Sequence, residues 1–132
     1  MHGSASSVEL RELLKSKVNQ EAFVYYERLG RVRRYTLNHY AEPVALEDVA
    51  RVAAMERTSF STFFHRKTGV CFHDWLAAVR VAKAMSLMAS GNLPVREVGR
   101  AVGLENVRTF ERTFLRMAGC PPIEYKISVR PS

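Results

Sequence analysis

The chain has 132 residues, enough for one domain or two small ones, and its modest core leaves little room for an enzyme with a large cofactor site. Lysine and arginine outnumber aspartate and glutamate by 20 to 13, and the resulting net charge of +7 favours a polyanionic partner such as DNA. No stretch approaches the roughly 20 apolar residues of a membrane span, and no apolar leader follows the first residues. We therefore expect a cytoplasmic protein without a membrane partner.

The chain opens with a small, polar stretch, residues 1–7, which we expect to be a disordered tail. Apolar side chains then recur at helical spacing, which predicts a helical extension over residues 8–31. Gly30 and its basic neighbours are expected to separate this extension from a short helix that ends near Tyr40. Packing on the following domain or pairing with a second copy would bury the apolar face of the extension. A third alternative is that the extension is the remainder of a longer protein's linker.

Residues 32–71 have the pattern of a helix-turn-helix unit. We expect one helix over residues 46–53, a turn over residues 54–57 and a second helix over residues 58–67, closed by a glycine. Ala54 occupies the turn position at which φ is expected to be positive, a conformation that is costly for a residue with a side chain.

Residues 72–91 contain no internal proline, and their only glycine closes the segment, so we predict one connector helix about 28 Å long. A connector of this length would hold two recognition helices about one DNA turn apart, roughly 34 Å. Residues 92–130 form a second helix-turn-helix unit, in which Gly103 takes the turn position and a proline pair precedes a short final helix. The predicted fold is all-α, with two helix-turn-helix subdomains, a long connector helix and an N-terminal helical extension.

The two units are copies of each other. Residues 49–56 align with residues 98–105 at an offset of 49, and the offset becomes 50 after one inserted residue. Self-similarity of this kind marks a duplicated supersecondary unit. Ala50 and Gly99 are small, which is expected where the second helix of each unit crosses the first. The aromatic positions that we expect to face the core are Phe60, Phe63 and Phe64 in the first unit and Phe110 and Phe114 in the second.

The cysteines and histidines do not form a metal-binding or catalytic set. Cys71 and Cys120 lie 49 residues apart, neither belongs to a C-x-x-C pair, and Cys71 with His73 supplies at most two ligands. The sequence also lacks a glycine-rich phosphate loop and a paired nucleophile and base. We expect no metal, no cofactor and no enzymatic activity.

Over about residues 32–128 the pattern resembles the AraC/XylS family of bacterial transcription regulators, whose DNA-binding domain has two helix-turn-helix units joined by a long helix. The motifs that carry the resemblance are Leu46-Glu47-Asp48-Val49-Ala50, Phe64 through Gly69, Arg80-Val81-x-x-Ala84, Gly103-Leu104, Phe110-Glu111-Arg112-Thr113-Phe114 and Gly119-Cys120-Pro121-Pro122-x-x-Tyr125-Lys126. The chain departs from the family at Ala54, where a glycine is usual, and at Leu104, where an aromatic residue is common. The resemblance implies a regulator at the bacterial nucleoid that binds double-stranded DNA and contacts RNA polymerase.

The resemblance also implies which residues face DNA. The base-reading set is Thr58, Ser61 and Thr62 in the first unit and Val107, Arg108, Thr109, Glu111 and Arg112 in the second. Hydroxyls discriminate bases less than bidentate arginine, so the second unit is expected to carry more of the specificity. Arg112 is predicted to contact guanine, and Glu111 either accepts from cytosine or orients Arg108. Phosphate contacts are assigned to Arg57, Lys67, Arg116 and Lys126, with a solvated surface charge as the alternative for each.

The predicted function is a sequence-specific transcription regulator that reads two major-groove segments about one helical turn apart. The alternative is an AraC-like interaction module that binds another regulator or RNA polymerase and has weak DNA affinity. The short hydroxyl side chains of the first recognition helix and the helical extension motivate this alternative. A homodimer formed through residues 8–31 is a further candidate assembly.

Overall fold

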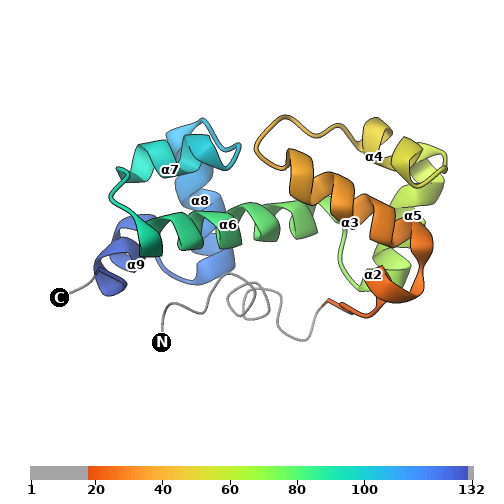
Figure 1. Cartoon of the computed structure of the whole chain (residues 1–132), viewed down its shortest axis with the longest axis horizontal. Coiled ribbons are helices and arrows are strands. Elements are labelled where there is room, and N and C mark those ends of the chain that lie inside the picture. Colours follow the sequence, from red (N-terminus) through yellow and green to blue (C-terminus); the bar gives the residue numbers. More distant parts are fainter. Residues whose placement is uncertain (1–17, 131–132) are drawn as a thin grey trace. The chain divides into compact units, whose positions relative to one another are not determined.

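The computed structural model describes residues 18–130, so the tail expected over residues 1–7 and the extension's residues 8–17 lie outside the described residues. Within residues 18–130 every regular element is a helix, labelled α2 to α9 in Figure 1. These residues divide into two packed units, and the division falls after Leu76, inside the continuous helix α6 (Phe72–Ser90). The all-α fold with two helix-turn-helix units and a connector helix is confirmed. None of these helices is both long and apolar enough to cross a bilayer.

The first unit consists of four helices and the first turns of α6, and its helix-turn-helix is formed by the third and fourth of them. The bounds of the four helices are α2 (Ala22–Tyr25), α3 (Glu27–His39), α4 (Leu46–Val52) and α5 (Arg57–Thr68). The residue after α5, Gly69, has φ 91°, the left-handed conformation that commonly ends a helix. Helices α4 and α5 agree with the predicted helices to within a residue at each end.

The prediction that Gly30 separates the front of the chain from the next helix is wrong. Helix α3 runs without interruption from Glu27 to His39 and contains both Gly30 and the arginines that surround it. The break lies at Tyr26, whose backbone is extended. A Cβ atom on Gly30 would lie 3.1 Å from the carbonyl oxygen of Phe23, so the glycine permits a close approach of the backbone and does not end a helix.

The described part of the expected extension, residues 18–31, packs into the first unit. The Phe23 ring stacks on Trp75 with 5.0 Å between ring centroids and meets Phe64 edge-on at 5.9 Å. Val18, Ala22 and Leu29 are also buried. Aromatic pairs at these distances add to the burial of apolar area, so α2 is part of this unit's core.

The chain just before α2 is fastened to the C-terminal end of α5. The backbone N–H of Asn19 donates to the carbonyl oxygen of Thr68 at 2.8 Å, and the side-chain amide of Asn19 donates to the carbonyl oxygen of Lys67 at 3.4 Å. Thr68 is fully buried, and its hydroxyl donates to the carbonyl oxygen of Phe64 at 2.8 Å. These bonds satisfy carbonyl groups that a helix end otherwise leaves open.

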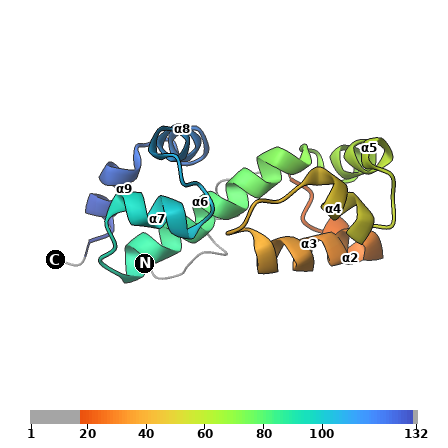
Figure 2. The ribbon, with the colours of Figure 1, turned by 90° about the horizontal axis from the view of Figure 1, so that it is seen from above.

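The second unit contains the rest of α6 and three further helices: α7 (Val95–Ala101), α8 (Val107–Ala118) and α9 (Pro122–Ser128). Helices α7, α8 and α9 contact one another, and Figure 2 looks nearly along α8. Phe110 and Phe114 of α8 are buried, and Phe114 also contacts the Tyr125 ring of α9 at 5.8 Å. The final helix therefore packs against the inner face of α8.

The two turns between paired helices have the same geometry. Ala54 has φ 59° and Gly103 has φ 92°. The hydrogen bonds of the following amides also match. The Met55 N–H donates to the carbonyl oxygen of Ala50 at 2.9 Å, and the Leu104 N–H donates to the carbonyl oxygen of Gly99 at 2.8 Å. The positive φ expected at residue 54 is confirmed, and a residue with a side chain in this region costs about 1–2 kcal/mol.

A small residue is required where α8 crosses α7. A Cβ atom on Gly99 would lie 2.8 Å from Cγ and 2.9 Å from Cδ2 of Phe110, and 3.0 Å from the carbonyl oxygen of Leu104. In the first unit the equivalent residue is Ala50, which is 2% exposed and keeps its methyl group. The second unit is thus packed more closely at this crossing.

Candidate nucleic-acid interface

Helix α5 presents a polar outward face. Phe60 and Phe64 are fully buried on its inner side, which turns the opposite side to solvent. Thr58 and Thr62 are exposed there, and Ser61 is half-buried at the edge of this face. The three residues predicted to face bases in the first unit therefore lie on or beside one exposed surface whose side chains are short hydroxyls.

Helix α8 has the same construction with longer side chains. Its inner side is formed by Phe110 and Phe114, and its exposed side carries Arg108, Glu111 and Arg112, while the predicted Thr109 is half-buried. Within residues 18–130, the side chains of Arg108, Glu111 and Arg112 have no ion-pair or hydrogen-bond partner. Glu111 therefore makes no ion pair with Arg108, and its role stays a prediction. Two uncommitted guanidinium groups on one helix face can donate to base edges or to phosphates.

Two apolar side chains lie on the same outward surface of α8. Val107, which was predicted, is 41% exposed at the start of the helix, and Leu115, which was not, is 50% exposed two turns later. Leu115 lines an open hollow together with Arg108, Glu111, Arg112 and Pro121. Its spacing of four residues from Glu111 and three from Arg112 could have identified it from the sequence. An apolar side chain in this place is suited to contact with a thymine methyl group or a deoxyribose.

The side chains assigned to phosphates also make contacts within the protein. Arg57 lies 3.7 Å from the carboxylate of Glu47, and the Lys67 ammonium lies 5.1 Å from the centre of the Tyr26 ring. Lys126 donates to the carbonyl oxygen of Leu93 at 2.8 Å. Arg116 lies on the exposed side of α8 and also has a partner. Contacts of this kind hold a cation in place and leave further donors open, so the phosphate assignments stay predictions.

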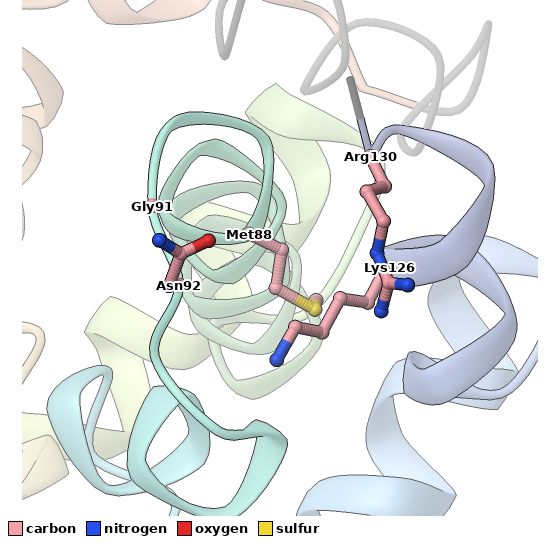
Figure 3. A pocket seen from close by; sticks show the side chains of 5 residues that line it. All are labelled: Met88, Gly91, Asn92, Lys126 and Arg130. Atoms are coloured by element: carbon pink, nitrogen blue, oxygen red, sulfur yellow. The ribbon is translucent and has the colours of Figure 1, made fainter. Parts of the chain in front are cut away.

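Lys126 lines an open pocket at the end of α6. Figure 3 shows Lys126 and Arg130 reaching from α9 and its end toward Met88, with Gly91 and Asn92 on the opposite side. The ammonium of Lys126 is held at the carbonyl oxygen of Leu93, just beyond the C-terminal end of α6, where the helix dipole favours a positive charge. This contact explains the position of Lys126 without a ligand.

Both cysteines are free thiols. Cys71 is exposed and Cys120 is half-buried. Burial raises the pKa of the Cys120 thiol, and the nearby Glu124 carboxylate raises it further, so the reactive thiolate form is disfavoured. No group of three or more histidine, cysteine, aspartate or glutamate side chains in residues 18–130 could hold a metal ion.

Comparison with known proteins identifies the family. Residues 49–127, which begin inside α4 and reach α9, match a family model described as a helix-turn-helix domain. The relatives that match include HTH-type transcriptional regulators and the arabinose operon regulatory protein. The chain belongs to the AraC/XylS family of helix-turn-helix proteins.

Two relatives of this AraC/XylS chain are regulators from Escherichia coli K12. The RCS-specific HTH-type transcriptional activator RclR is 29% identical over 119 residues, which cover 87% of this chain and 42% of RclR. The arabinose operon regulatory protein is 25% identical over 100 residues, which cover 75% of this chain and 34% of the relative. This AraC/XylS chain thus spans less than half the length of these curated relatives.

Solved structures show the same fold. The DNA-binding domain of AdpA, crystallised in complex with a target DNA, is 29% identical and has a TM-score of 0.73 over 78% of this chain and 93% of that domain. The C-terminal domain of AraT, a response regulator from Geobacillus stearothermophilus, is 26% identical, with a TM-score of 0.74 over 80% of this chain and 88% of that domain.

Proposed function

We propose that this AraC/XylS chain is a sequence-specific, DNA-binding transcription regulator that reads two major-groove segments about one helical turn apart. The observation that carries the proposal is the outward face of α8, the second helix of a helix-turn-helix unit, where Arg108 and Arg112 are exposed and have no partner among residues 18–130. The similarity to a domain crystallised with its target DNA supports it. Helix α8 would enter the major groove, with Arg112 donating to guanine.

The two recognition helices differ in what they can read. The hydroxyls of Thr58, Ser61 and Thr62 can bond several base edges, while a bidentate arginine contact with guanine discriminates by about 1–3 kcal/mol. The second unit would therefore choose the site, and the first unit would add affinity with less base preference. Arg57, Lys67, Arg116 and Lys126 would contact phosphates, which fix the register and carry no sequence information.

The names of the relatives support a role in transcription. One is named a transcriptional activator and another an operon regulatory protein, and both come from a bacterium. We infer that this chain acts at promoters on the bacterial nucleoid, in the cytoplasm, and that it contacts RNA polymerase there.

Selection from a random-sequence duplex pool at physiological salt tests the proposal. We expect enrichment of two short elements spaced about one helical turn apart, with the sharper element read by α8. Arg112→Ala should relax one guanine position by about 1–3 kcal/mol, whereas Arg33→Ala, the same charge change on the exposed face of α3, should leave the preferred sequence intact. No enrichment with a folded protein would refute direct reading of DNA.

One observation favours the second candidate function, binding of another protein chain. Val24 and Tyr25 of α2 are 86% and 79% exposed, next to Arg33 and Arg34 in an open groove. Apolar side chains this exposed are typical of contact surfaces, and a homodimer through the segment that contains them is one such contact. Light scattering over a range of concentrations, with Val24→Lys as the disrupting variant, tests it. A monomer at all concentrations would exclude the homodimer.

A further inference from the structure

The two recognition helices begin with the same cap geometry but with different charge. Glu56 precedes α5, and its carboxylate accepts from the backbone N–H of Ser59 at 3.1 Å. Asn106 precedes α8, and its side-chain oxygen accepts from the backbone N–H of Thr109 at 2.9 Å. Helices α5 and α8 start 50 residues apart, so Glu56 and Asn106 hold the same cap position, although the sequence repeat aligns Glu56 with Glu105. Both bonds satisfy the amide that an N-cap residue usually satisfies, but only the first places a formal negative charge there.

The charge of Glu56 is exposed and persistent. The N–H groups of Ser59 and then Thr58 hold the pKa of this carboxyl below its ordinary value, so the group is ionised at neutral pH. Arg57, a cation in the first turn of the same helix, lies 3.7 Å from Glu47. The outward residues that follow Glu56 are hydroxyls until His65 and Arg66 near the other end of α5. The first turn of α5 therefore presents a carboxylate to any approaching anion.

The start of a recognition helix is the part that comes closest to DNA in helix-turn-helix complexes. Its open amides and the positive end of the helix dipole attract a phosphate. At α5 the carboxylate of Glu56 occupies one of these amides and repels the phosphate. A like charge about 6 Å away in a water-like dielectric weakens binding roughly 3-fold for each phosphate. At α8 the neutral Asn106 satisfies the same amide, and the neighbouring carboxylate, Glu105, lies one residue before the cap and, within the described residues, accepts no helix amide.

We propose that Glu56 lowers the DNA affinity of the first unit and thereby leaves the choice of binding site to the second unit. This inference rests on the proposed function, because it concerns the same interface. The first recognition helix has only short hydroxyls in its base-facing positions. With Glu56 at its start, this helix would attract phosphates less strongly and would also discriminate bases less.

The experiment exchanges the caps and measures affinity for a duplex selected by the wild-type protein. Glu56→Asn installs the cap residue of α8, keeps the hydrogen bond to the amide and removes the charge, and we expect binding about 3- to 10-fold tighter. Glu56→Asp, which keeps both cap and charge, should bind within about 2-fold of wild type. Asn106→Asp, which adds the charge to α8, should weaken binding by a similar factor. Thermal unfolding of each variant checks that the helices remain capped.

A matched control separates the local effect from the overall charge. Glu27→Gln makes the same change in net charge at the exposed start of α3 and should leave the affinity nearly unchanged. Unchanged or weaker binding by Glu56→Asn would overturn the inference. A switch of the preferred base at one position would also overturn it, because Glu56 would then be reading a cytosine. If neither the wild type nor Glu56→Asn binds any duplex, the proposed function itself fails.

Discussion

Replacement of Gly99 by alanine should destabilise the second unit, although alanine is the better helix former. The added methyl group would lie 2.8 Å from Cγ and 2.9 Å from Cδ2 of Phe110 and 3.0 Å from the carbonyl oxygen of Leu104. Phe110 is 1% exposed and contacts Phe114, so its ring has little room to move away. The contact can be relieved only if the two helices separate.

The expected magnitude follows from two opposing effects. Overpacking of a filled core costs about 1–3 kcal/mol. Alanine recovers roughly 0.5–1 kcal/mol relative to glycine in a helix interior. The net loss of stability for Gly99→Ala is then about 1–2 kcal/mol. If the second unit unfolds on its own, each kcal/mol lowers its melting temperature by roughly 4–8 °C, because its chain is short. At Gly91, where the nearest atom to an added Cβ is 3.5 Å away, the same substitution meets no crowding.

Urea denaturation and native-state hydrogen exchange of the α7 and α8 amides measure this loss in the second unit separately from the first. Gly91→Ala is the matched control and should change stability by less than about 0.5 kcal/mol. Stability equal to or above that of wild type in Gly99→Ala would refute the reasoning, because the helices would then have room for a methyl group as they do at Ala50.

Three further outcomes follow from the structure. Ala54→Gly should raise the stability of the first unit by about 0.5–1 kcal/mol, since φ 59° suits glycine, and a lower urea midpoint would contradict the strain at this turn. Because the folded-state pKa of Glu56 is lowered, the stabilisation it gives is present above the ordinary carboxyl pKa and is lost as the pH falls through the lower folded-state pKa. The difference in stability between wild type and Glu56→Gln should therefore shrink as the pH falls below the ordinary carboxyl range, and a difference independent of pH would speak against it. Cys71 should be alkylated by iodoacetamide faster than Cys120, whose raised pKa and partial burial slow the reaction, and equal rates would exclude this difference.

The helices of both helix-turn-helix units could be predicted from local signals. The glycine after α5, the uninterrupted run of α6 and the proline at the start of α9 each act within a few residues of the helix end they determine. The same reasoning failed at Gly30. A glycine among basic residues was interpreted as a boundary, but its role depends on the approach of the Phe23 carbonyl, which is a tertiary contact.

The candidate site could be predicted as a set of helix positions but not as a set of contacts. The faces of α5 and α8 follow from the spacing of their phenylalanines, and Leu115 would have followed from the same spacing. The bond between Lys126 and Leu93, which are 33 residues apart, depends on how α9 packs and has no local signal. The difference in charge between the caps Glu56 and Asn106 was hidden in the repeat, which aligns Glu56 with Glu105, and it appears only in the hydrogen bonds that the two caps accept.

The bonds between Asn19 and the end of α5 also give the first unit a mechanical property. Tension applied to the chain at residue 18 is transmitted through the 2.8 Å bond from the Asn19 amide to the Thr68 carbonyl, and thus to the last turn of α5. Because Thr68 is itself bonded back to Phe64, that turn would move together with the part of the helix before it. A displacement of the polypeptide upstream of α2 would therefore change the tilt of the recognition helix directly, without first being absorbed by a slack linker.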